Sequence, residues 1–153
     1  MFTGKQIDYS AQTIRNDGWW PDVAVAEFER RTAQPADLDH QTIASALLSA
    51  IGQINLQLQV YQDSKREQGY LDAAAVPGVG LEGGNNALTE QYLAALFTRA
   101  QAELLPAAAS VTERTVANKT SEREPQTRDQ LLAISQQLIR VIKGKRRCGV
   151  ALI

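Results

Sequence analysis

The sequence predicts an all-α protein: a helical bundle with a long central helix, a glycine-rich loop and an extended C-terminal tail. Three observations support this fold class. Apolar residues recur at helical spacing along the segment 37–68, and two later segments show the same period. Alternation of apolar and polar residues is almost absent before the tail. Long helices joined by loops pack as a bundle.

Size and composition describe one ordinary domain. The chain has 153 residues, of which 44% are hydrophobic and 22% charged, so it can bury a core without disulfide bonds or a structural metal. The net charge of −1 gives no global electrostatic case for binding nucleic acid or an anionic membrane. The single Cys148 excludes an internal disulfide framework and indicates a reducing compartment. We find no stretch of roughly 18 apolar residues that would span a membrane, and no signal peptide.

We divide the chain into three parts: an N-terminal arm and turn (1–22), a helical bundle domain (23–144) and an extended tail (145–153). In the bundle, a short helix follows Pro21 and ends at a charged run and the Gln34-Pro35 pair. The long central helix comes next. Its predicted core stripe is Ile43, Leu47, Ile51, Ile54, Leu58 and Tyr61, widened by Ala44, Leu48, Leu56 and Val60.

Two more helices are expected after the central one. The first runs from Ala87 to about Leu105, where Pro106 interrupts or ends it, and residues 110–126 form a weak helix or a linker. The last begins at Thr127, whose hydroxyl and the Gln130 side chain can form a capping box. Its expected core stripe is Leu131, Ile134, Leu138 and Val141/Ile142, and Gly144 ends it.

The loop at residues 76–86 contains a literal G-x-G-x-x-G at 78–83. A dinucleotide site needs a strand before these glycines, and none is expected here, so we predict a mobile loop that binds no nucleotide. His40 is the only histidine, and no group of residues has metal-ligand spacing. Cys148 has no histidine near it in sequence to act as a base. The sequence predicts no enzyme, no cofactor and no metal.

The two tryptophans are adjacent, in the stretch NDGWWPD at residues 16–22. Neighbouring side chains diverge by about 100° in a helix and about 180° in a strand, so we expect only one ring to enter the core. We assign Trp20, fixed against Pro21, to the bundle and Trp19 to a neighbouring chain, because aromatic residues are favoured anchors at interfaces. Trp19, Trp20 and Pro21 are therefore candidate partner-binding residues.

The tail alternates apolar and small or charged residues, which suits a single strand. A lone strand leaves its backbone unpaired, so we expect it to add to a sheet edge of another chain; the alternative, that it folds back over its own bundle, stays open. We expect the last seven residues to be disordered in solution and ordered after assembly. The candidate partner contacts here are Arg147, Val150, Leu152 and Ile153.

Basic residues gather where the last helix meets the tail. We consider Lys143, Lys145 and Arg146 as contacts to DNA or to a portal protein. Such a cluster also complements the dipole at a helix C-terminus, which is the more ordinary role.

Several of these motifs together resemble the head-completion proteins of temperate contractile-tailed bacteriophages, the GPL family. The matching stretches follow one another along the chain: 16–22, 28–31, 50–55, 69–70, 76–77, 92–105 and the final Leu152-Ile153. Between 106 and 126 the family pattern is acidic and aromatic, whereas this chain is alanine-rich and polar. Any role of that segment does not carry over.

The resemblance implies a structural protein that joins the portal vertex after DNA packaging, stabilises the filled capsid and provides a surface for tail attachment. The implied partners are the portal protein, copies of the chain in a ring, a tail-side or terminator protein and, less strongly, packaged DNA, with no membrane. The implied location is the host cytoplasm during assembly and then the virion. The main alternative is a small cytoplasmic helical protein-interaction domain of a bacterial regulator.

Overall fold

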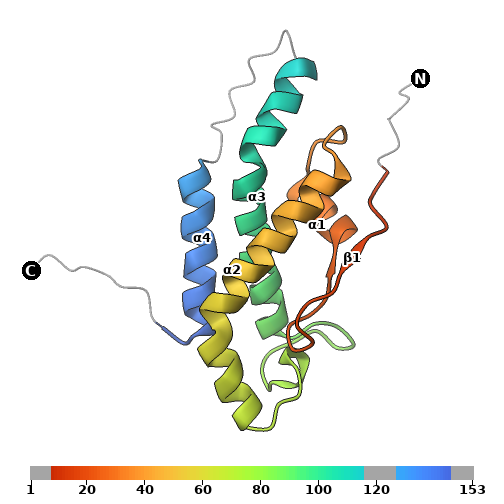
Figure 1. Ribbon diagram of the computed structural model, residues 1–153. Helices are drawn as coiled ribbons and strands as arrows, with labels where there is room; N and C mark the ends of the chain where they lie inside the picture. The colour runs from red at the N-terminus through yellow and green to blue at the C-terminus, as the bar shows by residue number, and fades with distance from the viewer. Residues whose placement is uncertain (1–7, 116–126, 146–153) are drawn as a thin grey trace, which may run out of the picture.

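The structure, a computed structural model, describes residues 8–115 and 127–145. Its elements follow the chain in this order: β1 (Thr13–Ile14), β2 (Val23–Ala24), α1 (Val25–Thr32), α2 (His40–Glu67), the 3-10 turn η1 (Ala73–Ala75), α3 (Ala87–Thr115) and α4 (Arg128–Ile142). Helix α3 packs against α1, α2 and α4, with α4 lying alongside it and α2 crossing in front (Figure 1). The predicted helical class is confirmed in outline. The helix at the centre is α3 rather than α2.

A small antiparallel β pair precedes the first helix. Ile14 lies opposite Val23 and Thr13 opposite Ala24. The sequence analysis placed Val23 in a helix, and this is wrong: the β-branched residue is fully buried in a strand, and α1 begins two residues later. The pairing joins the N-terminal arm to the bundle, because the β1 strand belongs to the arm.

Helix α2 has the predicted buried stripe but one exposed side. Asp39 caps its N-terminus by accepting a hydrogen bond from the amide of Thr42. Ile43, Leu47, Ile54 and Leu58 are at most 1% exposed, as the spacing predicts. The predicted widening of the stripe is confirmed for Ala44, which is 6% exposed, and wrong for the other three side chains, which face outward. Their exposed fractions are 55% for Leu48, 73% for Leu56 and 83% for Val60.

The composition of α2 also bears on membranes. By length and apolar content it is the one helix among the described residues that could cross a bilayer, which the sequence analysis had ruled out. A core helix passes the same test, and the buried stripe of α2 packs on α3.

Helix α3 passes straight through Pro106, contrary to the expected break. The proline is exposed, so its ring faces solvent, and the cost is the missing amide hydrogen bond of one turn. Helix α4 begins with the predicted capping box between Thr127 and Gln130. Its core stripe agrees with the prediction only in part: Leu131 and Ile142 are buried, but Ile134 and Val141 are about half exposed. The fully buried Ser135 donates to the carbonyl of Ala95 at 2.8 Å.

The glycine-rich segment forms a tight loop before α3. Gly80 and Asn86 form an isolated antiparallel bridge, and the Leu81 amide donates to the carbonyl of Asn85 at 3.1 Å. A Cβ on Gly80 would lie 3.0 Å from the Cα of Asn86, so the close approach requires glycine. The Asn86 side chain accepts from the amide of Thr89 and thereby caps α3.

Candidate interaction site

The NDGWWPD stretch is a turn held by its own aspartates. Gly18 has a φ of +87°, and the Asp17 carboxylate accepts the amides of Trp19 and Trp20, both at 2.9 Å. The Asn16 amide donates to the Asp22 carboxylate at 2.9 Å. The turn is therefore neither helix nor strand, and it bends the chain back from β1 to β2.

This geometry overturns the expected division of the tryptophans. Both rings are buried, with exposed fractions of 1% for Trp19 and 2% for Trp20. They meet edge to face at 4.6 Å, and Trp20 stacks on Tyr92 at 4.4 Å. The Trp19 indole nitrogen donates to the carbonyl of Tyr70 at 3.1 Å. The divergence rule applies to regular elements, whereas a bend can turn adjacent side chains into one core, so Trp19 is not an outward-facing partner contact.

A closed ring of hydrogen bonds ties the turn to two helices. The Asn16 side chain donates to the Tyr92 hydroxyl at 2.8 Å, that hydroxyl donates to Asn55 at 2.7 Å, and Asn55 donates back to Asn16 at 2.8 Å. Burial raises the pKa of the Tyr92 phenol, and the Asp17 charge raises it further, against the opposing hydrogen bond from Asn16. Each side chain both donates and accepts, which is the requirement for a buried polar group.

Pro21 belongs to the same framework. It is partly exposed, and its carbonyl accepts the Asn16 side chain at 3.0 Å. The motif that distinguishes this sequence thus fastens the arm to α2 and α3, and the described structure gives its tryptophans no outward surface.

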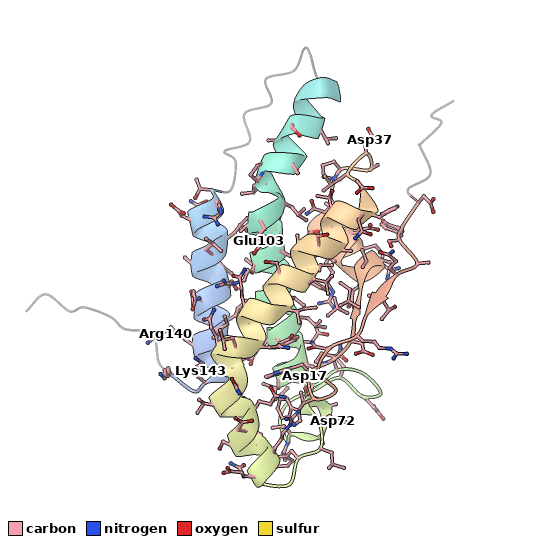
Figure 2. The ribbon with its side chains drawn as sticks, in the orientation of Figure 1. Asp17, Asp37, Asp72, Glu103, Arg140 and Lys143 are labelled. Atoms are coloured by element: carbon pink, nitrogen blue, oxygen red, sulfur yellow. The ribbon has the colours of Figure 1, made fainter. Side chains whose placement is uncertain are left out.

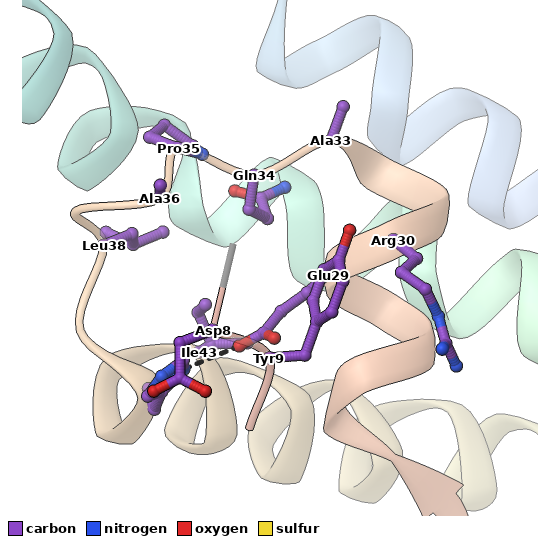
Figure 3. Close-up of a pocket in the computed structure, with 11 residues that line it drawn as sticks. Asp8, Tyr9, Glu29, Arg30, Ala33, Gln34, Pro35, Ala36, Leu38 and Ile43 are labelled. Atoms are coloured by element: carbon purple, nitrogen blue, oxygen red, sulfur yellow. Dashed lines mark hydrogen bonds and ion pairs between the residues drawn. The ribbon is translucent and has the colours of Figure 1, made fainter. Parts of the chain in front are cut away.

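A small hollow of about 150 Å³ lies between α1, the loop that follows it and the start of α2 (Figure 3). Glu29 lies beside it and is 8% exposed. One carboxylate oxygen accepts the Ser10 amide at 3.0 Å, and the other pairs with His40 at 2.7 Å. Because both oxygens already bind groups of the chain, Glu29 serves to join the arm and α2 to α1.

The outward side of α2 has an unusual composition. Between His40 and Asp63 the chain contains no aspartate, glutamate, lysine or arginine. Among these residues, Leu48, Gly52, Leu56, Gln59 and Val60 are all exposed, and we call them the α2 outer face. Interface cores are depleted of charge, so this composition is typical of a surface that another chain covers. The sequence analysis missed the face because it assigned its leucines to the core, although the lack of charge was visible in the sequence.

Hollows on the two flanks of the α2 outer face carry opposite charge. On one flank, a hollow of about 470 Å³ is lined by Asp17, Asp63 and Arg66, and we call it the α2 groove. On the other flank, Lys143 and Lys145 line a hollow of about 400 Å³ together with Val60. Figure 2 shows Lys143 on the α4 side of α2 and Asp17 on the opposite side.

The basic residues at the end of α4 are only partly described. The Lys143 amide donates to the carbonyl of Ile139, and Gly144 has a φ of +68°, so the helix ends where the sequence predicts. The remaining candidate contacts, Arg146, Arg147, Val150, Leu152 and Ile153, lie outside the described residues. The strand predicted for the tail, and its docking on a portal sheet edge, stay predictions.

The described part of the chain holds no group of three or more histidine, cysteine, aspartate or glutamate side chains placed to bind a metal. The 3-10 turn Ala73–Ala75, rather than a strand, precedes the G-x-G-x-x-G loop, so the loop does not sit in a βαβ unit. Its glycines therefore do not occur in the frame that positions a dinucleotide.

Fold and surface together define a small helical protein with an exposed, uncharged helix face flanked by hollows of opposite charge. The family model described as phage head completion protein (GPL) matches residues 14–153. One relative comes from Haemophilus phage HP1 (strain HP1c1) and is named probable head completion/stabilization protein. It is 32% identical to this chain over 154 residues, and the alignment covers both chains in full. No solved structure matches. The chain belongs to the phage head completion protein (GPL) family.

Proposed function

We propose that this protein completes and stabilises the bacteriophage head at its portal vertex. In this proposal it joins the portal protein after DNA packaging, stabilises the filled capsid and offers a surface for tail attachment. The observation that carries the proposal is the family match over residues 14–153, together with a full-length relative that is named for head completion and stabilization. The family is structural, and the role needs no catalytic group.

The geometry supports a protein that works through surfaces. On the α2 outer face Leu56 and Val60 are exposed by 73% and 83%, in a stretch of the helix, residues 41–62, that has no charged residue of its own. In the proposal the partners are the portal protein, copies of the chain in a ring and a tail-side or terminator protein, and the location is the host cytoplasm during assembly and then the virion. Lys143, Lys145 and Arg146 are the candidate contacts to packaged DNA or the portal. The bacterial-regulator alternative receives no support from the comparisons.

The test uses a phage that lacks this gene and is supplied with the protein in trans. Leu56→Glu places a charge on the α2 outer face, and Ala133→Glu places the same charge on an exposed position of α4. We expect heads made with Leu56→Glu to lose packaged DNA, measured as nuclease-sensitive DNA, and heads made with Ala133→Glu to keep it. If heads without any copy of the protein retain DNA and join tails normally, the proposed function is wrong.

A further inference from the structure

We propose that the α2 groove receives the C-terminal end of a second copy of this chain. The occupant is the segment that begins at Lys143 and continues through residues 146–153. The inference rests on the proposed function, because it assumes that several copies meet at the vertex, and it goes further by naming the two surfaces that join them.

Charge complementarity is the first argument. Two carboxylates line the groove near Gln62. Asp63 is the next residue and is exposed, whereas Asp17 adds its negative charge while its oxygens accept the Gln62 side chain at 2.7 Å and the Trp19 and Trp20 amides. Arg66 supplies the cation in the lining, about one turn farther along. The proposed occupant contains Lys143, Lys145 and two arginines, and has no acidic side chain before its terminal carboxylate. A basic segment beside an acidic groove favours the correct encounter and its register.

The order of groups along the two surfaces also agrees. From Asp63 the groove continues past Gln59, Leu56 and Asn55 to Gly52, so its acidic end is followed by an uncharged one in which Leu56 is the apolar side chain. The segment is basic first and then apolar, ending in Val150-Ala151-Leu152-Ile153. With its basic residues beside Asp63, the apolar end extends toward Leu56 and Gly52. One alignment therefore satisfies both the charges and the apolar groups.

Length permits this alignment. Asp63 and Gly52 are eleven positions apart in the sequence, which is roughly 16 Å along a helix axis. The eight residues after Lys145 span up to about 28 Å when extended. The segment is long enough to cover the groove and to leave a few residues as a connection between the copies.

The position of Lys143 and Lys145, where the segment begins, favours a second copy over the same copy. Lys143 and Lys145 line one hollow, and Asp17 lines the groove. Lys143 lies on the α4 flank of α2 and Asp17 on the other flank (Figure 2). To enter its own groove the segment must cross the ridge that carries Val60. Between copies, the basic end of one chain meets the acidic groove of the next without that crossing. Such a contact joins two different surfaces and so closes a ring when the rotation permits.

Cys148 allows a direct test, because it is the only cysteine in the chain. Gln59→Cys adds an exposed thiol in the groove, and Ala133→Cys adds one on α4 as a matched control. Filled heads carrying each variant as the sole copy are oxidised, and the chains are separated without reducing agent. We expect Gln59→Cys to give a ladder of covalent multimers. The ladder should survive dilution of the heads, because seated thiols react at an effective concentration of about millimolar.

Two control variants, Cys148→Ser and Ala133→Cys, and the identity of the cross-linked products decide the result. Adding Cys148→Ser to Gln59→Cys should abolish the ladder. A monomer with an internal disulfide would show that the segment enters its own groove, and a conjugate with a different head protein would show that the groove has another occupant. Each of these two products would overturn the inference. So would a ladder of equal intensity from Ala133→Cys, or the absence of a ladder from heads that contain the Gln59→Cys protein. Should Gln59→Cys fail to join heads, Arg66→Cys, which adds a thiol to the groove and keeps its carboxylates, is scored by the same outcomes. Absence of the unmodified protein from heads would instead contradict the proposed function.

Discussion

The NDGWWPD turn and the α2 outer face lie next to each other but differ in the burial of their side chains. In the turn, carboxylates, amides and one phenol bind one another, and both tryptophans are buried. On the outer face, Leu56 and Val60 are exposed and charge is absent. The more distinctive residues thus build the scaffold, and a stretch of ordinary leucines and glutamines forms the candidate interface. In this chain the motif that carries the family resemblance lies in the scaffold and not on the candidate interface.

The largest expected effect comes from the tryptophans. Trp19→Ala and Trp20→Ala should each lower the free energy of unfolding by about 3–5 kcal/mol, because each removes a large buried ring. Urea unfolding followed by circular dichroism measures this loss. Leu56→Ala on the outer face is the control and should change the stability by less than about 0.5 kcal/mol. If Trp19→Ala lowers the free energy of unfolding only slightly and Trp20→Ala lowers it strongly, the outward-facing Trp19 ring predicted from the sequence would be supported instead.

The hydrogen-bonded ring should give an intermediate effect. Tyr92→Phe keeps the aromatic stack on Trp20 but leaves the Asn16 and Asn55 side chains each without one partner. We expect a loss of about 1–3 kcal/mol in the free energy of unfolding. Tyr70→Phe removes a hydroxyl from a partly exposed tyrosine and should cost far less. Equal losses in the two variants would show that the ring adds nothing specific.

The same phenol predicts a pH dependence. Burial raises the pKa of Tyr92 above its ordinary value of 10.0, so the folded state resists ionisation. The contribution of the neutral Tyr92 phenol to the free energy of unfolding is therefore complete below about pH 10. Above that pH it is lost, by up to about 1.4 kcal/mol per pH unit. Unfolding measured from pH 8 to 11 should show a shallower decline for Tyr92→Phe than for the unmodified chain. Some slope should remain, since burial also raises the pKa of Tyr61; identical slopes would contradict the assignment.

How well the sequence predicted a feature depends on how far apart along the chain the residues that determine it lie. The α2 core stripe and the Thr127–Gln130 capping box depend on residues within a few positions of one another, and both are confirmed. The burial of Trp19 and the buried Ser135 depend on contacts with α3 or with the loop before it, far along the chain. Periodicity also cannot show which helix faces find a neighbour, and for that reason Leu56 was assigned to the core.

Helix continuation at Pro106 shows a second limit. A proline removes one hydrogen bond and so favours a helix end, but tertiary packing of α3 against the other helices outweighs that local cost. The site was harder still to predict, because an interface face is recognised by what it lacks. The absence of charge from 41 to 62 becomes informative only once the structure shows that half of the helix is exposed.

The smallest effect on stability should come from Gly52, and it should be of opposite sign. Glycine inside a helix costs up to about 1 kcal/mol relative to alanine, and here an added Cβ meets nothing within 4 Å. Gly52→Ala should therefore raise the free energy of unfolding by about 0.5–1 kcal/mol. If a second chain lies against the α2 groove, the same methyl group stands between the two backbones. The variant should then be more stable alone and yet poorer at retaining DNA in filled heads.

Ser45→Ala, at an exposed position of α2 outside the groove, is the matched control for Gly52→Ala. It should leave head stabilisation unchanged, because the serine has no place in the proposed contact. Unfolding of the isolated variants and nuclease sensitivity of DNA in heads made with each of them are the two measurements. A Gly52→Ala protein that is more stable and supports heads as well as the unmodified chain would mean that no partner approaches α2 at this position. The glycine would then be only a weak point in the helix.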